Sequence, residues 1–293
     1  MIDSVTVSAP CKINLHLRVL GRRSDGFHDI ESVFQLVSVA DRLSVSIVPD
    51  RGSCEFVCPA MELPAVNTVT KALALFRALT GVDTGVRMEL DKRVPSGAGL
   101  GGGSSDAAAA LVALDRLFGT GLGRDGLLPL ACKIGSDVPF FLSDPAAVVL
   151  GRGERVLPIP ARDDLFGVLV WPDAHCPTPA AYGLVDAWRE RFPGTDRDWP
   201  AVGDLGRLYR GDPGTWPFGN SFTAPVAEAF PIVGEALRDV RGTNPAFAEM
   251  SGSGSAVFGI YEDETSADSA RICLSARWKT CLKFLLLASS PMR

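Results

Sequence analysis

The sequence predicts an α+β protein, and three observations lead to this fold class. Apolar and polar residues alternate through the first fifty positions, as they do in strands of an antiparallel sheet. A glycine-rich loop then joins a predicted strand to an alanine-rich helix, and a second loop of small residues precedes another strand near the end. Strands and helices therefore follow one another in mixed order, whereas a doubly wound parallel sheet requires regular alternation.

Length and composition suggest how this fold is divided. At 293 residues the chain is long enough to form two domains. Its composition changes near positions 158–164, as it often does in a segment between domains. We therefore expect an N-terminal domain over residues 1–160 and a C-terminal domain over residues 161–293.

The first predicted strand lies in the stretch VTVSAPCKINLHLRVLG. Its apolar residues, including Cys11, share one face, whereas Lys12 and Asn14 share the other. Turn-forming residues at 25–26 end this part of the chain. The following stretch, SVFQLVSVADRLSVSIV, predicts further strands that are joined near residues 40–41. The first fifty residues are thus expected to form a small antiparallel sheet.

A helix and a strand are expected before the glycine-rich loop, and a second helix after it. Asn67 is a suitable cap for a helix that reaches Leu79, and Gly81 is expected to end it. The stretch GVRMELDKRV alternates as a strand and leads into the loop. A second helix is predicted from about Ser104 to Phe118. The order is therefore strand, glycine loop, helix.

The rest of the chain has weaker signals. A helical run precedes KIGSDVPFFL, and AAVVLGRGERVLPI predicts a strand with a tight turn at residues 151–153. Residues 188–220 are rich in Pro, Gly, Asp and Trp and lack a sustained period, so irregular structure or short helices are expected there. The small-residue loop at 251–255 is followed by a predicted strand over 256–261.

Composition excludes several classes of function. The net charge is −5, so the chain lacks the excess of basic residues that is typical of proteins that bind nucleic acid or anionic membranes. The N-terminus has no basic region followed by a long apolar run, and the apolar stretch Phe284–Ala288 is too short to span a bilayer. Seven scattered cysteines and three histidines form no metal-ligand spacing. We expect a cytoplasmic protein without a disulfide framework or a zinc site.

The glycine-rich loop, PSGAGLGGGSSDAAAAL, is the strongest local signal. Gly97, Gly99 and Gly102 match the dinucleotide-binding pattern, but no strand ending in an acidic residue follows about 20 positions on. No lysine follows the last glycine as a phosphate-binding P-loop requires. Glycines nevertheless let backbone N–H groups approach phosphate, and the following helix directs its N-terminus to the same place. Phosphate binding is therefore favoured over a flexible linker or a tight strand-to-helix turn, with hydroxyls of Ser104 and Ser105 available to phosphate or Mg²⁺.

Three other residues have both a structural and a functional interpretation. Asp137, in GSDVPFF, is either a helix cap or a catalytic base. Lys12 belongs either to a solvated strand face or to a site beside the sheet that it shares with Asn14. His28 is either an exposed turn histidine or part of a frame for a flat heterocycle. The residues alone leave these alternatives open.

Six segments, taken together and in this order, resemble the GHMP small-molecule kinase superfamily: SAPCKINLHL, RRSDGFHDIESVF, VPSGAGLGGGSSDAAAAL, GSDVPFFL, FGNSF and EMSGSGSAVF. The match covers most of the chain, from about Ala9 to Tyr261. The resemblance implies a two-domain fold, with an N-terminal domain like domain 2 of ribosomal protein S5 and a ferredoxin-like C-terminal domain. It also implies an ATP-dependent kinase with its active site between the two domains.

The resemblance is greater to the branch of this superfamily that phosphorylates a cytidine diphosphate derivative in non-mevalonate isoprenoid biosynthesis. The implied reaction transfers the γ-phosphoryl group of ATP to the 2-hydroxyl of that small-molecule substrate. The segment DGFH suits a cytosine and has no evident purpose for a small aliphatic acceptor. Kinases of homoserine, mevalonate or sugars, the related decarboxylases, and an RNA-binding module are the competing interpretations. A monomer or weak homodimer without nucleic acid or membrane partners is expected.

The resemblance also assigns roles to residues. Asp137 matches the catalytic aspartate, and Lys12 matches the lysine near the acceptor hydroxyl. Mg²⁺ is expected on Ser104 or Ser105, water and ATP. The residues implied to bind the substrate are Asn14, Phe27, His28 and Tyr182, and those implied to wrap the triphosphate are Pro95, Gly97, Gly99, Leu100, Gly101, Gly102, Gly103, Ser104 and Ser105.

Two of the substrate-binding assignments concern aromatic residues. Phe27 stands where the superfamily branch often has tyrosine, so stacking on cytosine is kept and a phenol hydrogen bond is lost. His28 is implied to lie against the cytosine. Tyr182 is implied to close the opposite side of the base.

Overall fold

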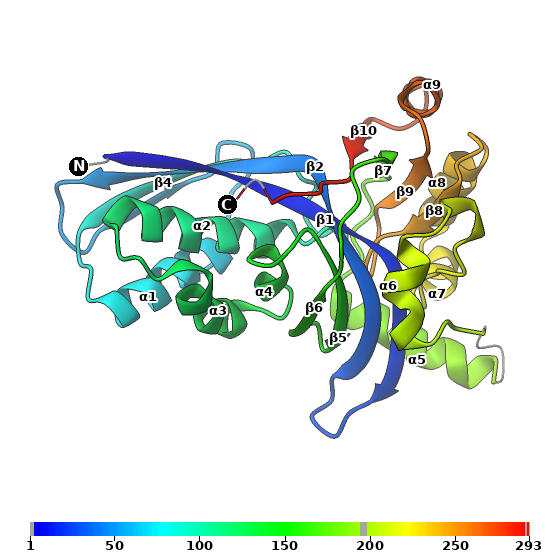
Figure 1. Cartoon of the computed structure of the whole chain (residues 1–293), viewed down its shortest axis with the longest axis horizontal. Helices are drawn as coiled ribbons and strands as arrows, with labels where there is room; N and C mark the ends of the chain where they lie inside the picture. Colours follow the sequence, from blue (N-terminus) through cyan, green and yellow to red (C-terminus); the bar gives the residue numbers. More distant parts are fainter. Residues whose placement is uncertain (1–2, 194–197, 291, 293) are drawn as a thin grey trace.

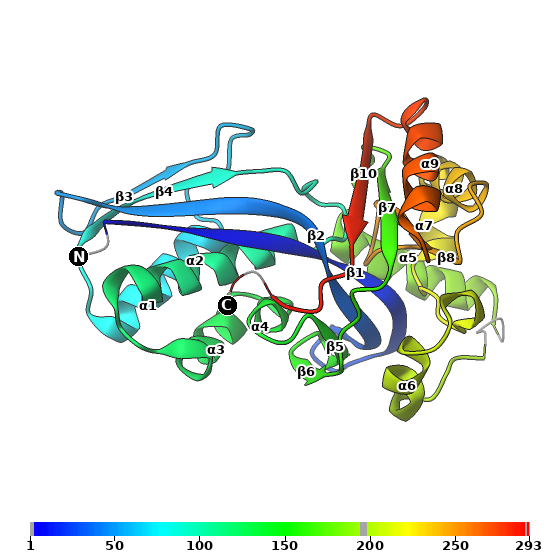
Figure 2. The same ribbon diagram turned by 45° about the horizontal axis from the view of Figure 1, so that its top comes forward.

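The fold consists of two β-sheets with helices packed on them, as Figures 1 and 2 show. The computed structural model describes residues 3–193, 198–290 and 292. Within these ranges, strands before residue 160 form a six-stranded sheet and strands after residue 165 form a four-stranded one. The mixed α+β architecture predicted from the sequence is confirmed. The exact domain division at residue 160 stays a prediction.

The six-stranded sheet has the order β3-β4-β2-β5-β6, and β1 pairs with β2 beside this path. All its pairings are antiparallel except that of β3 with β4. Helices α1 to α4 lie on one face of this sheet (Figure 1). Its strands are β1 (Ser4–Arg22), β2 (His28–Val48), β3 (Cys54–Val57), β4 (Gly85–Asp91), β5 (Ala146–Gly151) and β6 (Arg155–Pro158).

Strand β2 differs from its prediction as two strands joined near residues 40–41. It is one strand of 21 residues that exchanges neighbours along its length. Residues 30–35 pair with β5, whereas residues 42–48 pair with β4. The pairing of β1 with β2 shifts register between these two parts, in the stretch from Leu36 to Ala40 that precedes Asp41. The turn chemistry at this position therefore reflects a bulge in a long strand.

The helices on this sheet begin and end close to where capping chemistry predicts. In α1 (Thr68–Thr80), the Asn67 side chain accepts hydrogen bonds from the amides of Val69 and Thr70, and Gly81 ends the helix with φ 73°. Alanines 107–110 of α2 are fully buried, so this helix packs close to β1 and β2. The helices are completed by α2 (Gly102–Phe118), α3 (Gly123–Ile134) and α4 (Val138–Phe141).

The second sheet is antiparallel, in the order β10-β7-β9-β8. One of its faces packs on α8 and α9, and the other shares a hydrophobic core with β1, β2 and β5. Short helices form part of the segment that precedes α7. The elements are β7 (Phe166–Trp171), α5 (Thr178–Arg191), α6 (Leu205–Tyr209), α7 (Thr223–Ala229), α8 (Pro231–Arg241), β8 (Phe247–Met250), β9 (Val257–Tyr261), α9 (Glu264–Ser275) and β10 (Thr280–Leu285), with 3₁₀ turns at Val202–Asp204 and Pro213–Thr215.

The end of the chain returns to the first sheet. Leu286 forms an isolated bridge with Val37, and the Gln35 side chain donates to the carbonyl of Leu287. Met292 is buried in the hydrophobic core under the six-stranded sheet. The two halves of the sequence are therefore joined by more than the connection near residue 160. Among the described residues, no helix is both long and apolar enough to cross a membrane.

A buried ion cluster links β2, β4 and α2. Lys92 Nζ lies 2.5 Å from Asp41 Oδ2 and 3.0 Å from Asp106 Oδ2. Asp41 also accepts hydrogen bonds from the amides of Arg93 and Val94, which hold the chain just before the glycine-rich loop. Burial raises the pKa of Asp106 to about 7, with the nearby Asp41 charge acting in the same direction and Lys92 opposing both. Two carboxyl groups thus share one ammonium group away from water.

Replacing Asp106 by asparagine is expected to alter how stability depends on pH. Between about pH 4 and pH 7 the folded protein holds a proton on Asp106 that the unfolded chain releases, so the free energy of unfolding falls as pH rises. Asparagine keeps the shape but cannot ionise. From pH 5 to pH 8, the free energy of unfolding of Asp106→Asn should therefore rise by about 1–3 kcal/mol relative to that of the wild type.

Urea unfolding at the two pH values measures this change. Asp91→Asn, in the same region of the chain but half exposed and paired with Arg93, serves as the matched control. An equal difference in stability at pH 5 and pH 8 for Asp106→Asn would contradict the expected titration.

Candidate active site

A cavity of about 1100 Å³ lies where the glycine-rich loop, β1 and α5 meet. This volume slightly exceeds the ~300–1,000 Å³ range of small-molecule sites. Of the residues predicted to form the site, all but Ser105 line it. These are Lys12, Asn14, Phe27, His28, Pro95, Gly97, Gly99, Leu100, Gly101, Gly102, Gly103, Ser104, Asp137 and Tyr182.

The glycine-rich loop needs its glycines for conformation and for close packing. Gly97, Gly99 and Gly101 have φ values of 66°, 78° and 69°, which L side chains rarely adopt. A Cβ on Gly99 would lie 2.1 Å from the Ser251 carbonyl oxygen, because the second small-residue loop packs directly against the first. Gly102 and Gly103 then occupy the first turn of α2, where no preceding helical carbonyl accepts from their amides. These amides and the helix N-terminus suit an anionic ligand in the cavity.

The two serines after the glycines have different environments. Ser104 lines the cavity. Ser105 is fully buried, and its hydroxyl donates a 2.6 Å hydrogen bond to the carbonyl of Pro10 in β1. Ser105 therefore does not fit its predicted place on phosphate or metal, because successive helical residues point about 100° apart. Its hydroxyl instead ties α2 to the sheet.

Lys12 enters the cavity from the polar face of β1. It is only 4% exposed, so the alternative of a solvated strand face is wrong. Its Nζ donates to Asn14 Oδ1 at 2.5 Å and to the Gly99 carbonyl at 3.2 Å, and it lies 4.5 Å from the ring centre of Phe34. Burial lowers the pKa of Lys12, while the charge of Asp137 opposes that change.

Asn14 supports this lysine from the same strand. Its Nδ2 donates to Ser32 Oγ, which orients its oxygen toward Lys12. The backbone amide of Asn14 donates to Ser251 Oγ, and that hydroxyl donates to the carbonyl of Gly99. The strand, the glycine-rich loop and the second small-residue loop are thus held by one buried polar network.

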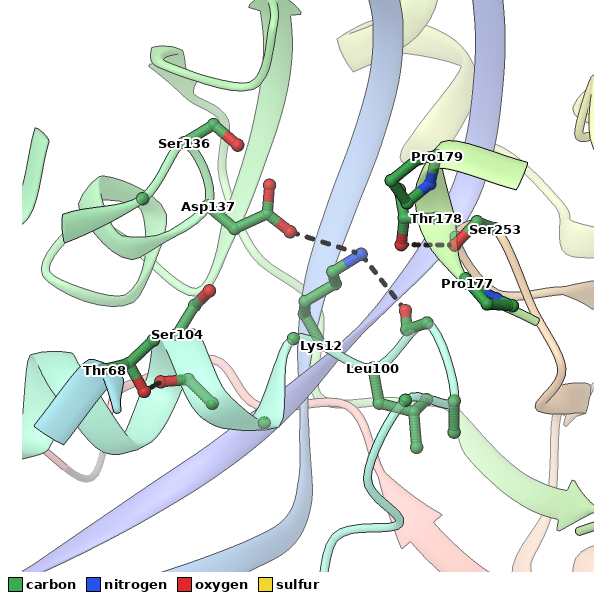
Figure 3. Close-up of a pocket in the computed structure, with 18 of the residues that line it drawn as sticks. Lys12, Thr68, Leu100, Ser104, Ser136, Asp137, Pro177, Thr178, Pro179 and Ser253 are labelled. Carbon is green, nitrogen blue, oxygen red and sulfur yellow. Dashed lines mark hydrogen bonds and ion pairs between the residues drawn. The ribbon is translucent and has the colours of Figure 1, made fainter. Parts of the chain in front are cut away.

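Asp137 faces Lys12 across the cavity, as Figure 3 shows. Its Oδ2 lies 3.8 Å from Lys12 Nζ, and its side chain is 27% exposed. Asp137 occupies the N-cap position of α4, but its side chain accepts no capping hydrogen bond. The carboxylate is therefore held beside a buried ammonium and remains accessible to a ligand.

An aromatic pair lies at another part of the cavity. His28, at the start of β2, is 6% exposed, so its interpretation as an exposed turn residue is wrong. Its ring stacks on that of Tyr182 from α5, with ring centres 4.8 Å apart and planes 13° apart. Burial raises the pKa of Tyr182 to about 12, so the phenol stays neutral. Phe27, the residue before His28, is 56% exposed, and its ring lies under the guanidinium of Arg152.

Several cavity residues had no role in the sequence analysis. Asp186 contacts His28, and the hydroxyl of Thr178 lies 3.1 Å from that of Ser253. Asp186 comes four residues after Tyr182, and helical periodicity over TPAAYGLVDAW is the signal that would have placed both on one face. Thr178 and Ser253 are far apart in the sequence, and no local pattern connects them.

Comparison with known proteins identifies the family. The model of the GHMP kinases N terminal domain matches residues 67–151, and that of the GHMP kinases C terminal domain matches residues 197–280. A 4-diphosphocytidyl-2-C-methyl-D-erythritol kinase of Treponema pallidum is 43% identical over 289 residues, which cover 97% of this chain and 99% of the relative. The chain belongs to the GHMP kinase family.

Other GHMP kinases agree with this assignment. A Burkholderia mallei protein with the same name is 38% identical over 280 residues, covering 94% of this chain and 91% of the relative. The crystal structure of a 4-(cytidine 5′-diphospho)-2C-methyl-D-erythritol kinase superposes with a TM-score of 0.82 at 35% identity, covering 96% and 99% of the two chains.

A more distant structure, the homoserine kinase from Cytophaga hutchinsonii, has a TM-score of 0.69 at 17% identity, covering 99% of this chain and 96% of the other. At that identity the likeness shows the common fold alone.

Proposed function

We propose that this GHMP kinase transfers the γ-phosphoryl group of ATP to the 2-hydroxyl of 4-diphosphocytidyl-2-C-methyl-D-erythritol. The products are the 2-phosphate and ADP, in non-mevalonate isoprenoid precursor biosynthesis. The observation that carries the proposal is the match, over nearly the full length of both chains, to kinases named for this acceptor. The cavity supports it by combining a glycine-rich loop, a lysine–aspartate pair and an aromatic pair.

Asp137 is the proposed general base. It orients the 2-hydroxyl and accepts its proton as the oxygen forms a bond to the γ-phosphorus. The bond between the γ-phosphorus and the bridging oxygen of ADP breaks in the same displacement. Lys12, whose Nζ lies 3.8 Å from Asp137 Oδ2, stabilises negative charge that develops near the acceptor oxygen.

The glycine-rich loop is the proposed triphosphate site. The free amides at the start of α2 can donate to phosphate oxygens, and the loop conformation brings the backbone itself close to the ligand. The residues fit Mg²⁺ only in part: Ser104 offers a hydroxyl, and no group of three or more His, Cys, Asp or Glu side chains lies together in the described part of the chain. This donor set suits an ion held mainly by phosphates and water, which neutralises charge on the transferred group.

His28 and Tyr182 are the proposed walls of the cytosine site. Their rings stack directly on each other, with centres 4.8 Å apart. A base between two stacked rings requires a separation of about 7 Å, so the base is proposed to approach the edge of His28 rather than to enter between the two rings. Phe27, which is exposed beside them, presents a further apolar surface to the base or ribose.

A panel of acceptors tests the proposed substrate. We expect ADP release with 4-diphosphocytidyl-2-C-methyl-D-erythritol. With homoserine or mevalonate, kcat/KM should be at least about 10³-fold lower, because these acceptors lack a base for His28 and Tyr182 to bind. Coupled detection of ADP measures each rate, with ATP alone as the control. Turnover of homoserine or mevalonate without turnover of the cytidyl compound would overturn the assignment.

The sequence also predicts a cytoplasmic monomer or weak homodimer without nucleic acid partners. These statements stay predictions. The acidic net charge of −5 supports the absence of nucleic acid binding.

A further inference from the structure

We infer that Asp186 is a positioning residue that sets the tautomer of His28 and thereby the choice between cytosine and uracil. This role rests on the proposed function, in which the acceptor carries cytosine. It begins with helix α5, which places Tyr182 and Asp186 one turn apart on the same face. Both side chains line the cavity and both contact His28.

The two contacts hold different parts of the imidazole ring. Tyr182 covers one face of the ring, with planes 13° apart. Asp186 meets its edge, with Oδ1 2.9 Å from His28 Nε2. Because the histidine is only 6% exposed, the ring has little freedom to turn away from either partner. Helix α5 thus fixes both the orientation of the His28 ring and the ring nitrogen that carries hydrogen.

The contact with Asp186 determines which ring nitrogen carries the proton. An ionised carboxylate only accepts hydrogen bonds, so the nitrogen facing it must carry hydrogen. In the neutral ring, Nε2 is then the donor and Nδ1 the acceptor. Because Nε2 is used within the protein, Nδ1 is the ring nitrogen left for a ligand.

An acceptor at Nδ1 distinguishes the two pyrimidines by their position 4. Cytosine carries an amino group there, which donates to an acceptor, whereas uracil carries a carbonyl oxygen, which repels it. A polar site built for one pattern leaves its groups unpaired with the other. Asp186 therefore favours the cytidyl ligand without contacting the base itself.

The closing experiment compares binding of cytidine 5′-diphosphate and uridine 5′-diphosphate by calorimetry. Asp186→Asn can donate to His28 Nε2 and so allows the opposite tautomer, and Asp186→Ala removes the partner. We expect wild-type protein to prefer the cytidine compound by at least about tenfold, and both variants to lose most of that preference. Glu190→Gln, one turn further along α5 and exposed, is the matched control and should retain it.

Nuclear magnetic resonance of ¹⁵N-labelled histidines adds a direct readout, because the chain has only three histidines. His28 should be the Nε2–H tautomer in the wild type and should lose that state in Asp186→Asn. An unchanged preference in both variants, an equal loss of both ligands, or an Nδ1–H tautomer in the wild type would overturn the inference. Failure of the proposed function would appear separately, as absent turnover of the cytidyl acceptor by wild-type protein.

Discussion

Asp137→Asn is expected to lower kcat by about 10²- to 10⁴-fold, the range usual for loss of a general base. Asparagine has nearly the same shape and keeps an oxygen near Lys12, but it cannot accept the proton of the acceptor hydroxyl. The Asp137 side chain makes no capping hydrogen bond to α4, so the fold should tolerate the change. The Kd for ATP should change little, since the proposed triphosphate contacts come from the glycine-rich loop.

Single-turnover kinetics and nucleotide binding measure these two effects separately. Asp125→Asn is the matched control: this aspartate is exposed in the first turn of α3 and lies outside the cavity lining. It should retain wild-type kcat. Near-normal turnover by Asp137→Asn would remove this residue from the role of base and would leave substrate positioning as the main source of catalysis.

Lys12→Met is expected to lower kcat by about 10²- to 10³-fold, similar to the loss of a preorganised charge-stabilising group. Methionine keeps an apolar chain against Phe34 and Gly101, so the packing around the stem is largely preserved. The change removes the Lys12 ammonium donor from Asn14 Oδ1, at a cost of about 1–3 kcal/mol in stability, whereas the Gly99 carbonyl keeps the Ser251 hydroxyl as a donor. Removing a buried charge with a lowered pKa offsets part of that cost.

The rate of phosphoryl transfer and the free energy of unfolding must both be measured for this variant. Lys279→Met, an exposed lysine before β10, is the control and should change neither quantity. A loss of stability large enough to unfold Lys12→Met, with normal kcat in the remaining folded fraction, would show that Lys12 supports the fold rather than the reaction.

The two variants differ in what they do to the pair. Asp137→Asn leaves a buried ammonium next to a neutral amide, and the desolvation that already lowers the pKa of Lys12 then acts without its opposing carboxylate. Lys12→Met leaves a carboxylate that is 27% exposed and can be hydrated. The aspartate therefore tolerates the loss of its partner better than the lysine does.

Local sequence patterns predicted much of the secondary structure for reasons visible in the structure. Asn67 and Gly81 mark the two ends of α1 in the sequence because their capping interactions are made within a few residues. The alternation in β1 separated core residues from Lys12 and Asn14 because each face of a strand meets one environment. Strand β2 was divided wrongly because its change of neighbours depends on β4 and β5, which follow much later in the chain.

The candidate site was predicted less completely for the same reason. The loop glycines, Lys12 and Asp137 were recognised as motifs, and the structure brings them to one cavity. Ser105 was included because, like Ser104, it offers a hydroxyl beside the loop glycines, but the direction of that hydroxyl depends on where α2 meets Pro10. Asp186 was missed because its partner, His28, is remote in the sequence.

By itself, the sequence determined the fold class, the caps of α1 and, through its resemblance, the superfamily. These depend on contacts between neighbouring residues or on motifs that stay intact when read in order. Only the tertiary structure decided that Lys12 is buried beside Asp137, that Ser105 points into the protein and that Asp186 and Tyr182 together hold His28. Burial, charge pairing and side-chain direction arise where segments distant in the sequence pack together, and periodicity along one segment carries no information about them.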